Sequence, residues 1–124
     1  MASKGAGWRT FEVEGFEILV GKGARENDEL TFRVARPRDL WLHAAGFAGS
    51  HVVVKLPEGV DDAPRSVILR AAELAAWYSK AREARGKIPV HLCRAGNVHK
   101  RRGAPAGQVE IERYETVRVY PRGE

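Results

Sequence analysis

The sequence has 124 residues, of which 44% are hydrophobic and 30% charged, with a formal net charge of +5. This indicates one globular domain that buries roughly two thirds of its unfolded surface, and it excludes an intrinsically disordered chain. No apolar run approaches the roughly 20 residues that span a bilayer, and the N-terminus lacks the apolar core of a secretory signal, so we expect a cytoplasmic protein with no membrane contact.

The N-terminal third is predicted to be rich in strands. Residues 1–10 are expected to form a flexible tail ahead of a domain over residues 11–121. The alternating stretches TFEVE and FEILV predict a hairpin that turns near Glu14 and Gly15. The polar stretch ARENDEL predicts about one helical turn, and LTFRVA predicts a strand that Pro37 ends.

The stretch DLWLHAAGFAGSHVVVK, residues 39–55, predicts two short strands around a loop of small residues. Side chains alternate between the faces of a strand, so Asp39, Trp41 and His43 share the polar face. His51, Val53 and Lys55 share the same face of the second strand. If residues 44–50 form the loop, the three facing pairs are His43 with His51, Trp41 with Val53, and Asp39 with Lys55.

A long helix is predicted from Pro64 to Arg85, with Gly86 as its stop. Its last turns carry Lys80, Arg82 and Arg85, where the helix dipole favours cations. Further strands are predicted in IPVHLCRA, QVEIER and TVRVYP. The expected fold is therefore a single α+β domain with a mixed or antiparallel sheet of about six to eight strands and one long helix.

Positive charge is concentrated in one segment. Residues 77–102 hold eight basic side chains and one acid, so their net charge is +7 and the rest of the chain sums to −2. This asymmetry favours a polyanionic partner, with nucleic acid as the first candidate. A solvated basic face with no partner is the alternative.

The histidines and the single cysteine match no metal motif. His91 and Cys93 are two residues apart on a predicted strand, which is not a usual ligand spacing, and no second cysteine exists. His43 and His51 could bind a metal with Asp39, but imidazoles on a polar face have simpler uses. We expect no metal and no cofactor, and we expect Cys93 to be a small buried side chain.

Four stretches occur in one order: GFEILVGKGARENDELTFRVA, RDLWLHAAGFAGSHVVV, AAELAAWYSKAR, and VHKRRGAPAGQV with a final VRVYP. Together they resemble the NFACT-R family over about residues 11–121. This is the RNA-binding domain of the ribosome-associated quality-control factors RqcH and NEMF, and it also occurs as a free-standing bacterial protein. The resemblance implies a non-enzymatic module that binds tRNA or ribosomal RNA on the large ribosomal subunit. No stretch here matches the N-terminal domain or the coiled coil of full-length factors, so we do not expect their alanine-tailing role to transfer.

The candidate RNA-binding residues combine the polar strand face, the end of the helix and the basic loop. They are Asp39, Trp41, His43, Ser50, His51, Ser79, Lys80, Arg82, Arg85, Lys100, Arg101 and Arg102. Aromatic rings beside cations suit unstacked bases and phosphates.

Several alternatives stay open. Trp41 could pack under the helix while Asp39 fixes a histidine tautomer within a buried polar network. Ser79 could donate to a phosphate or bond back within its helix. Asp39, His43 and His51 could instead form an RNA-cleaving acid–base site, with or without a metal, and the basic face could bind an acidic protein.

Overall fold

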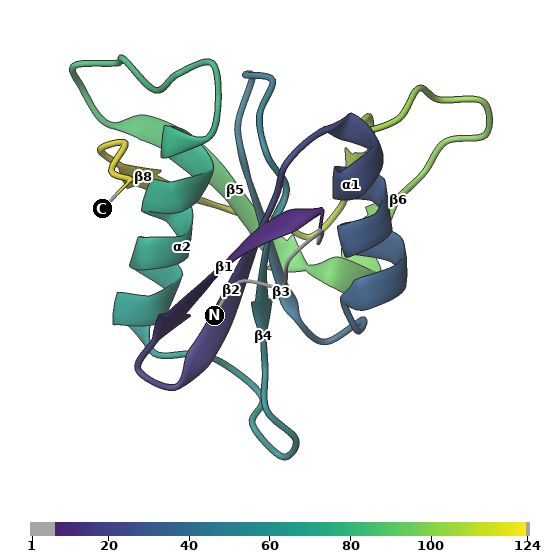
Figure 1. Cartoon of the computed structure of the whole chain (residues 1–124), viewed down its shortest axis with the longest axis horizontal. Helices are drawn as coiled ribbons and strands as arrows, with labels where there is room; N and C mark the ends of the chain where they lie inside the picture. Colours follow the sequence, from purple (N-terminus) through teal and green to yellow (C-terminus); the bar gives the residue numbers. More distant parts are fainter. Residues whose placement is uncertain (1–6, 124) are drawn as a thin grey trace.

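The computed structural model describes residues 7–123 and shows an α+β domain built on a six-stranded antiparallel sheet (Figure 1). The strand order is β1-β2-β4-β3-β5-β8, and β6 and β7 form a separate two-stranded sheet. The strands are β1 (Trp8–Val13), β2 (Phe16–Gly21), β3 (Leu40–Ala44), β4 (Val52–Lys55), β5 (Ile88–Arg94), β6 (Val98–His99), β7 (Glu110–Ile111) and β8 (Glu115–Val119). The helical segments are α1 (Ala24–Glu29), η1 (Leu30–Val34), α2 (Arg65–Trp77) and η2 (Ala95–Asn97). The predicted fold class and strand number are confirmed.

Helices cover both faces of the large sheet (Figure 1). On one face α2 packs over the apolar side chains of the central strands, including Leu42 and Val54, and Leu74 of the helix is fully buried against them. On the other face Leu30 of η1 packs with Trp41 and its neighbours. No helix in the described part of the chain is long and apolar enough to cross a membrane.

The predicted N-terminal hairpin is confirmed as β1 and β2. Glu14 and Gly15 both have positive φ, 51° and 85°, as a two-residue hairpin turn requires. The first strand starts earlier than predicted, because Trp8 pairs with Gly21 and Thr10 pairs with Leu19. Three residues of the expected tail therefore belong to the sheet, and residues 1–6 lie outside the described part.

The predicted strand over residues 30–35 is wrong, because residues 30–34 continue α1 as a π-helical turn. Valine, threonine and phenylalanine favour strands, but tertiary packing overrides that preference. Asn27, Leu30 and Thr31 are all buried, and their spacing of three and four residues is helical. This spacing could have identified the helix from the sequence.

The predicted helix over residues 64–85 is correct in place but too long, because α2 ends at Trp77. The residues that follow pair with the β3–β4 loop instead of extending the helix. Ser50 N–H donates to Tyr78 O at 2.8 Å, and Lys80 N–H donates to Ala48 O at 2.8 Å. Lys80, Arg82 and Arg85 therefore lie in a turn region beyond the helix.

Candidate nucleic-acid interface

The polar face of β3 and β4 has the predicted register. Trp41 is paired with Val53 across the antiparallel strands. The same register brings His43 and His51 to a ring-centroid distance of 5.6 Å, and Lys55 to within 2.7 Å of Asp39. The two polar pairs lie at opposite ends of the hairpin, and their surroundings differ.

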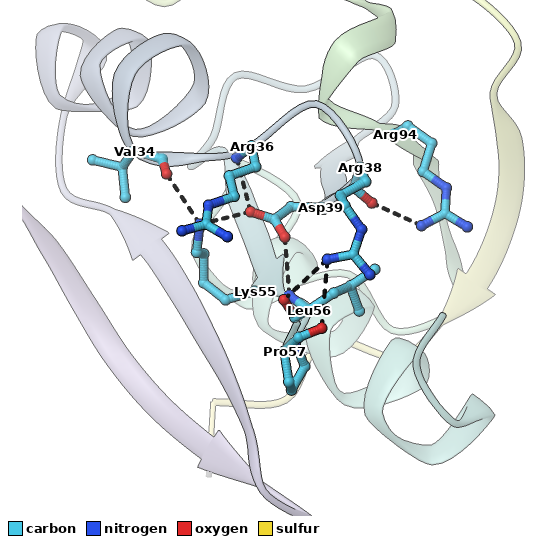
Figure 2. A network of polar contacts seen from close by, with 8 residues as sticks. All are labelled: Val34, Arg36, Arg38, Asp39, Lys55, Leu56, Pro57 and Arg94. Carbon is cyan, nitrogen blue, oxygen red and sulfur yellow. Dashed lines mark hydrogen bonds and ion pairs between the residues drawn. The ribbon is translucent and has the colours of Figure 1, made fainter. Parts of the chain in front are cut away.

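At one end Asp39 is a buried structural anchor (Figure 2). Its carboxylate accepts hydrogen bonds from Lys55 Nζ at 2.7 Å, from Leu56 N–H at 2.9 Å and from Arg36 N–H at 2.8 Å. Lys55 Nζ also donates to Val34 O at 3.0 Å, which ties the end of η1 to β4. Burial alone would raise the pKa of Asp39, but these hydrogen bonds outweigh it and lower the pKa below its usual value.

Arg38 in the loop before β3 and Arg94 at the end of β5 form further hydrogen bonds next to Asp39. Arg38 donates to Leu56 O and Pro57 O, and Arg94 donates to Arg38 O at 2.7 Å (Figure 2). The side chain of Asp39 is 0% exposed and makes all of its hydrogen bonds within the domain. We therefore leave Asp39 out of the surface that we propose for RNA. It does not bond a histidine either, so the alternative in which Asp39 fixes a histidine tautomer is wrong.

At the other end a chain of hydrogen bonds runs inward from the histidines. Trp41 Nε1–H donates to Thr31 Oγ1 at 3.1 Å, and Thr31 Oγ1 lies 2.8 Å from His51 Nδ1. His51 Nε2 lies 3.1 Å from Gly107 O. Because the Gly107 carbonyl can only accept, the proton of the neutral imidazole is on Nε2, and the Thr31 hydroxyl donates to Nδ1 while it accepts from Trp41.

Trp41 and His51 are therefore part of the core, with 1% of each residue exposed. Trp41 is packed in the core as the packing alternative predicts, but beneath α1 and η1 on the sheet face opposite α2, and not beneath the predicted helix. Stacking of RNA on its indole is wrong because the ring is not accessible. Burial, together with the neighbouring His43, lowers the pKa of His51 to about 4. His51 is neutral at physiological pH, with both ring nitrogens in use.

Beyond His51, a row of rings crosses the sheet toward the surface. His43 is paired with His91 on β5, and the His91 ring lies 4.4 Å from the Tyr114 ring, centroid to centroid. His43 and His91 are half-buried, while Tyr114 is 48% exposed. We call His51, His43, His91 and Tyr114 the ring row.

The ring row lines an open groove of about 1090 Å³ at one end of the sheet. Its walls come from the start of β1, the residues between β2 and α1, the β3–β4 loop, the turn after α2 and the loop before β7. The β3–β4 loop is held in place by Asn27, which accepts His51 N–H and donates to Gly49 O. A Cβ at Gly21 would overlap the side chain of Asn27, so this position requires glycine.

Four cations line the groove: Arg9, Lys22, Lys80 and Arg82. The groove lining contains no aspartate or glutamate, and none of the four cations forms an ion pair with another described residue. The Arg9 guanidinium lies 4.5 Å from the centroid of the Tyr78 ring, and that of Arg82 lies 4.1 Å from that of Trp77. Stacked arginines keep their N–H edges free for a ligand. We call these four residues the groove cations.

The predicted residues divide between the groove and the rest of the domain. Those lining the groove are Trp41, His43, Ser50, His51, Ser79, Lys80 and Arg82. Both serines already have partners, because Ser79 Oγ donates to Ala76 O at 2.7 Å and Ser50 Oγ donates to Gly21 O at 2.5 Å. The back-bonding alternative for Ser79 is confirmed.

The basic loop of residues 99–102 lies outside the groove, and most of its charge is paired. Lys100 Nζ lies 2.9 Å from Asp28 and also donates to Pro105 O and Gln108 O. Arg101 lies 2.6 Å from Glu110. Arg102 is exposed and forms no ion pair with a described residue, and the same is true of Arg85 in the turn after α2.

Sequence reasoning missed Arg9, Lys22, Tyr78, Trp77 and Tyr114 as groove residues. Arg9 and Lys22 precede the basic segment by more than fifty residues, and only the fold brings them to it. The sequence predicts Trp77 and Tyr78 to lie inside a longer helix; α2 ends at Trp77, and both side chains line the groove.

Cys93 is buried as predicted, and burial raises the pKa of its thiol to about 11. In the described part of the chain, no three histidine, cysteine, aspartate or glutamate side chains are gathered closely enough to bind a metal ion.

The sequence and the fold are both similar to those of known proteins. The family model described as the NFACT protein RNA binding domain matches residues 7–113. The Rqc2 homolog RqcH of Bacillus subtilis is 40% identical over 113 residues, which are 90% of this chain and 19% of that protein. The Drosophila melanogaster protein named ribosome quality control complex subunit NEMF homolog is 28% identical over 77% of this chain and 9% of its own length.

The fold matches a solved structure, the C-terminal part of the fibronectin/fibrinogen-binding protein from Streptococcus suis. The TM-score is 0.85 at 38% identity, over 97% of this chain and 47% of that one. The chain spans about a fifth of the length of the bacterial relative RqcH.

Proposed function

The chain belongs to the NFACT RNA-binding domain family, and from this premise we propose that it is a non-enzymatic module that binds RNA in its groove. The observation that carries the proposal is the charge of the groove: four cations line it, none of them paired, with no acid among the lining residues. An arginine presents a two-pronged donor to phosphate and a lysine presents a point charge. A surface of this kind binds the RNA backbone without reading its sequence.

The RNA that we propose is tRNA or ribosomal RNA of the large subunit, within ribosome quality control. The names of the relatives support this assignment, because they refer to ribosome quality control and to the Rqc2 homolog RqcH. A cytoplasmic location belongs to the same proposal. Nuclease treatment of a cell extract should then release the domain from sedimenting ribosomes, whereas an acidic protein partner would keep it there.

The geometry argues against an RNA-cleaving acid–base site. His51 has both ring nitrogens engaged and a pKa lowered to about 4, so it neither accepts nor donates a proton at neutral pH. Asp39 lies at the opposite end of the hairpin, bonded to Lys55. Of the three residues of that alternative, this leaves only the half-buried His43.

Binding and integrity of a labelled RNA test the proposal. The RNA should bind and stay intact with and without a chelator, and fragments would support the enzymatic alternative. The variant Lys80→Ala/Arg82→Ala should weaken binding by at least about ten- to a hundredfold, because even one hydrogen bond to a charged group contributes about 1.5–3 kcal/mol. The matched control is Arg65→Ala/Arg118→Ala, which removes two exposed cations outside the groove. Equal affinities in the two variants would contradict the proposal.

A further inference from the structure

The ring row is a feature of the groove that phosphate binding does not explain. Its members are neighbours from strand to strand: the rings of His51 and His43 are 5.6 Å apart between centroids, and His43 is the register partner of His91 across β3 and β5. The Tyr114 ring closes the row against His91 at 4.4 Å. Exposure rises along the row, from 1% at His51 to 48% at Tyr114. The row therefore leads from the core to an open ring at the surface of the groove.

Tyr114 differs in position from the other exposed large hydrophobic side chains of the described chain. Those are Phe32, Phe47 and Tyr120, and none of them lines the groove. The residue before Tyr114, Arg113, has a φ of 54°, a conformation that is uncommon for residues other than glycine. Backbone held in such a conformation is often found at functional positions.

The ring row presents uncharged ring faces to a ligand, whereas the groove cations present positive charge. Burial lowers the pKa of each of the three histidines, and the histidines lower one another's further at His51 and His43. The three histidines are therefore neutral at physiological pH, in contrast to the groove cations. A neutral aromatic surface beside a cationic one suits a nucleobase beside its own phosphate.

From this arrangement we propose that the groove binds single-stranded RNA, with one unpaired base stacked on Tyr114 at the open end of the ring row and the backbone phosphates on the groove cations. The bases of a duplex are already stacked on one another and have no free face for Tyr114. This inference rests on the proposed function and names its substrate class.

A short single-stranded RNA that carries one 2-aminopurine tests the base site directly, because the fluorescence of this base falls when it stacks. Wild-type protein should quench it. Tyr114→Ala should abolish the quenching and weaken binding by about 5- to 150-fold, the range for loss of one stacked base. Tyr114→Phe, which restores the ring, should restore both, and Tyr114→Leu should not, since it returns apolar bulk without an aromatic face. Tyr120→Ala, an exposed tyrosine outside the groove, is the matched control.

The duplex of the same sequence is the second arm. It should bind more weakly than the single strand, and its affinity should not change in Tyr114→Ala. If Tyr114→Ala binds and quenches like wild type while Lys80→Ala/Arg82→Ala loses affinity, the base site is wrong and the phosphate groove stands. If neither variant changes binding, the base site and the proposed function both fail.

Discussion

The two ends of the β3–β4 hairpin carry polar side chains on one face of the same two strands, yet they differ in what they contact. At one end the buried Asp39 pairs with the half-buried Lys55, and the pair ties together η1, the loop before β3 and the end of β4. At the other end His51 is buried, and His43 beside it borders the groove. Alternation along a strand fixes which face a side chain occupies, whereas its exposure depends on what packs over that face.

Here the covering element is the helical segment of α1 and η1. Leu30 and Thr31 cover Trp41 and the inner histidine, and Asn27 holds the β3–β4 loop. Beyond that cover the same face opens into the groove. The comparison predicts that changes at the Asp39 end affect stability alone, and that changes at the groove end affect RNA binding.

The largest expected effect is at the Asp39 end. Asp39→Ala should lower the free energy of unfolding by about 3–5 kcal/mol, because Lys55 and two backbone N–H groups lose their acceptor. Urea denaturation measures this. Asp39→Ala/Lys55→Met removes the unpaired charge and should recover part of the loss. At a temperature where the single variant is folded, its RNA affinity should equal that of wild type, and a specific loss of affinity would break the comparison.

Acid should destabilise the domain through His51. The pKa of His51 is about 4 in the folded state, whereas the ordinary pKa of a histidine, taken here for the unfolded chain, is 6.5. Between these values the unfolded chain binds a proton that the folded chain does not, so stability is complete above about pH 6.5 and falls as the pH drops toward 4, by up to about 3 kcal/mol. The charges of His43 and Lys100 lower the pKa of His51 in the same direction as burial, whereas the charge of Asp28 raises it.

Urea denaturation at pH 7.5, 6 and 5 measures this effect, with His51→Gln as the comparison. His51→Gln should lose most of the dependence, and His43 and His91, whose pKa values are also lowered, should supply the rest. Asp39 does not act in this window, because its ordinary pKa of 3.8 is lowered further by folding. A flat pH profile in wild type would show that His51 is not buried as a neutral ring.

A smaller effect should distinguish the two histidines of the hairpin: replacing His51 should mainly reduce stability, and replacing His43 should mainly reduce RNA binding. His51→Ala should lower the free energy of unfolding by about 1–3 kcal/mol, because it leaves Gly107 O without a donor and the hydroxyl proton of Thr31 without an acceptor. His43→Ala, at a half-buried position, should cost less than about 1 kcal/mol and mainly weaken RNA binding. Thermal or urea unfolding together with RNA titration checks both, and equal losses of stability would contradict the division.

The sequence predicted the register of the two strands at the site better than it predicted which of their side chains are exposed. Alternation and the small-residue loop were enough to pair Trp41 with Val53 and to bring His43 to His51. They could not tell that Trp41 and His51 lie beneath a helix, because the segment that covers them is rich in strand-forming residues and was predicted as a strand.

Charge along the chain also misled the prediction. The basic loop at residues 99–102 is dense in sequence, but Asp28 and Glu110 pair with Lys100 and Arg101 in the fold. The groove cations gather instead from β1, the β2–α1 connection and the turn after α2. Because ion pairs and grooves are made by residues distant in sequence, a local count of charges does not locate them.

The salt dependence of RNA affinity tests the central claim that the groove cations hold the phosphates. Four cations on a single strand predict a slope of log affinity against log salt of about −3, since each contributes about −0.7. Lys80→Ala/Arg82→Ala should flatten the slope by about 1.4, while the matched pair Arg101→Ala/Arg102→Ala should change it by less than about 0.7. The reverse ranking, with the loop variant flatter than the groove variant, would place the RNA on the loop and contradict the account.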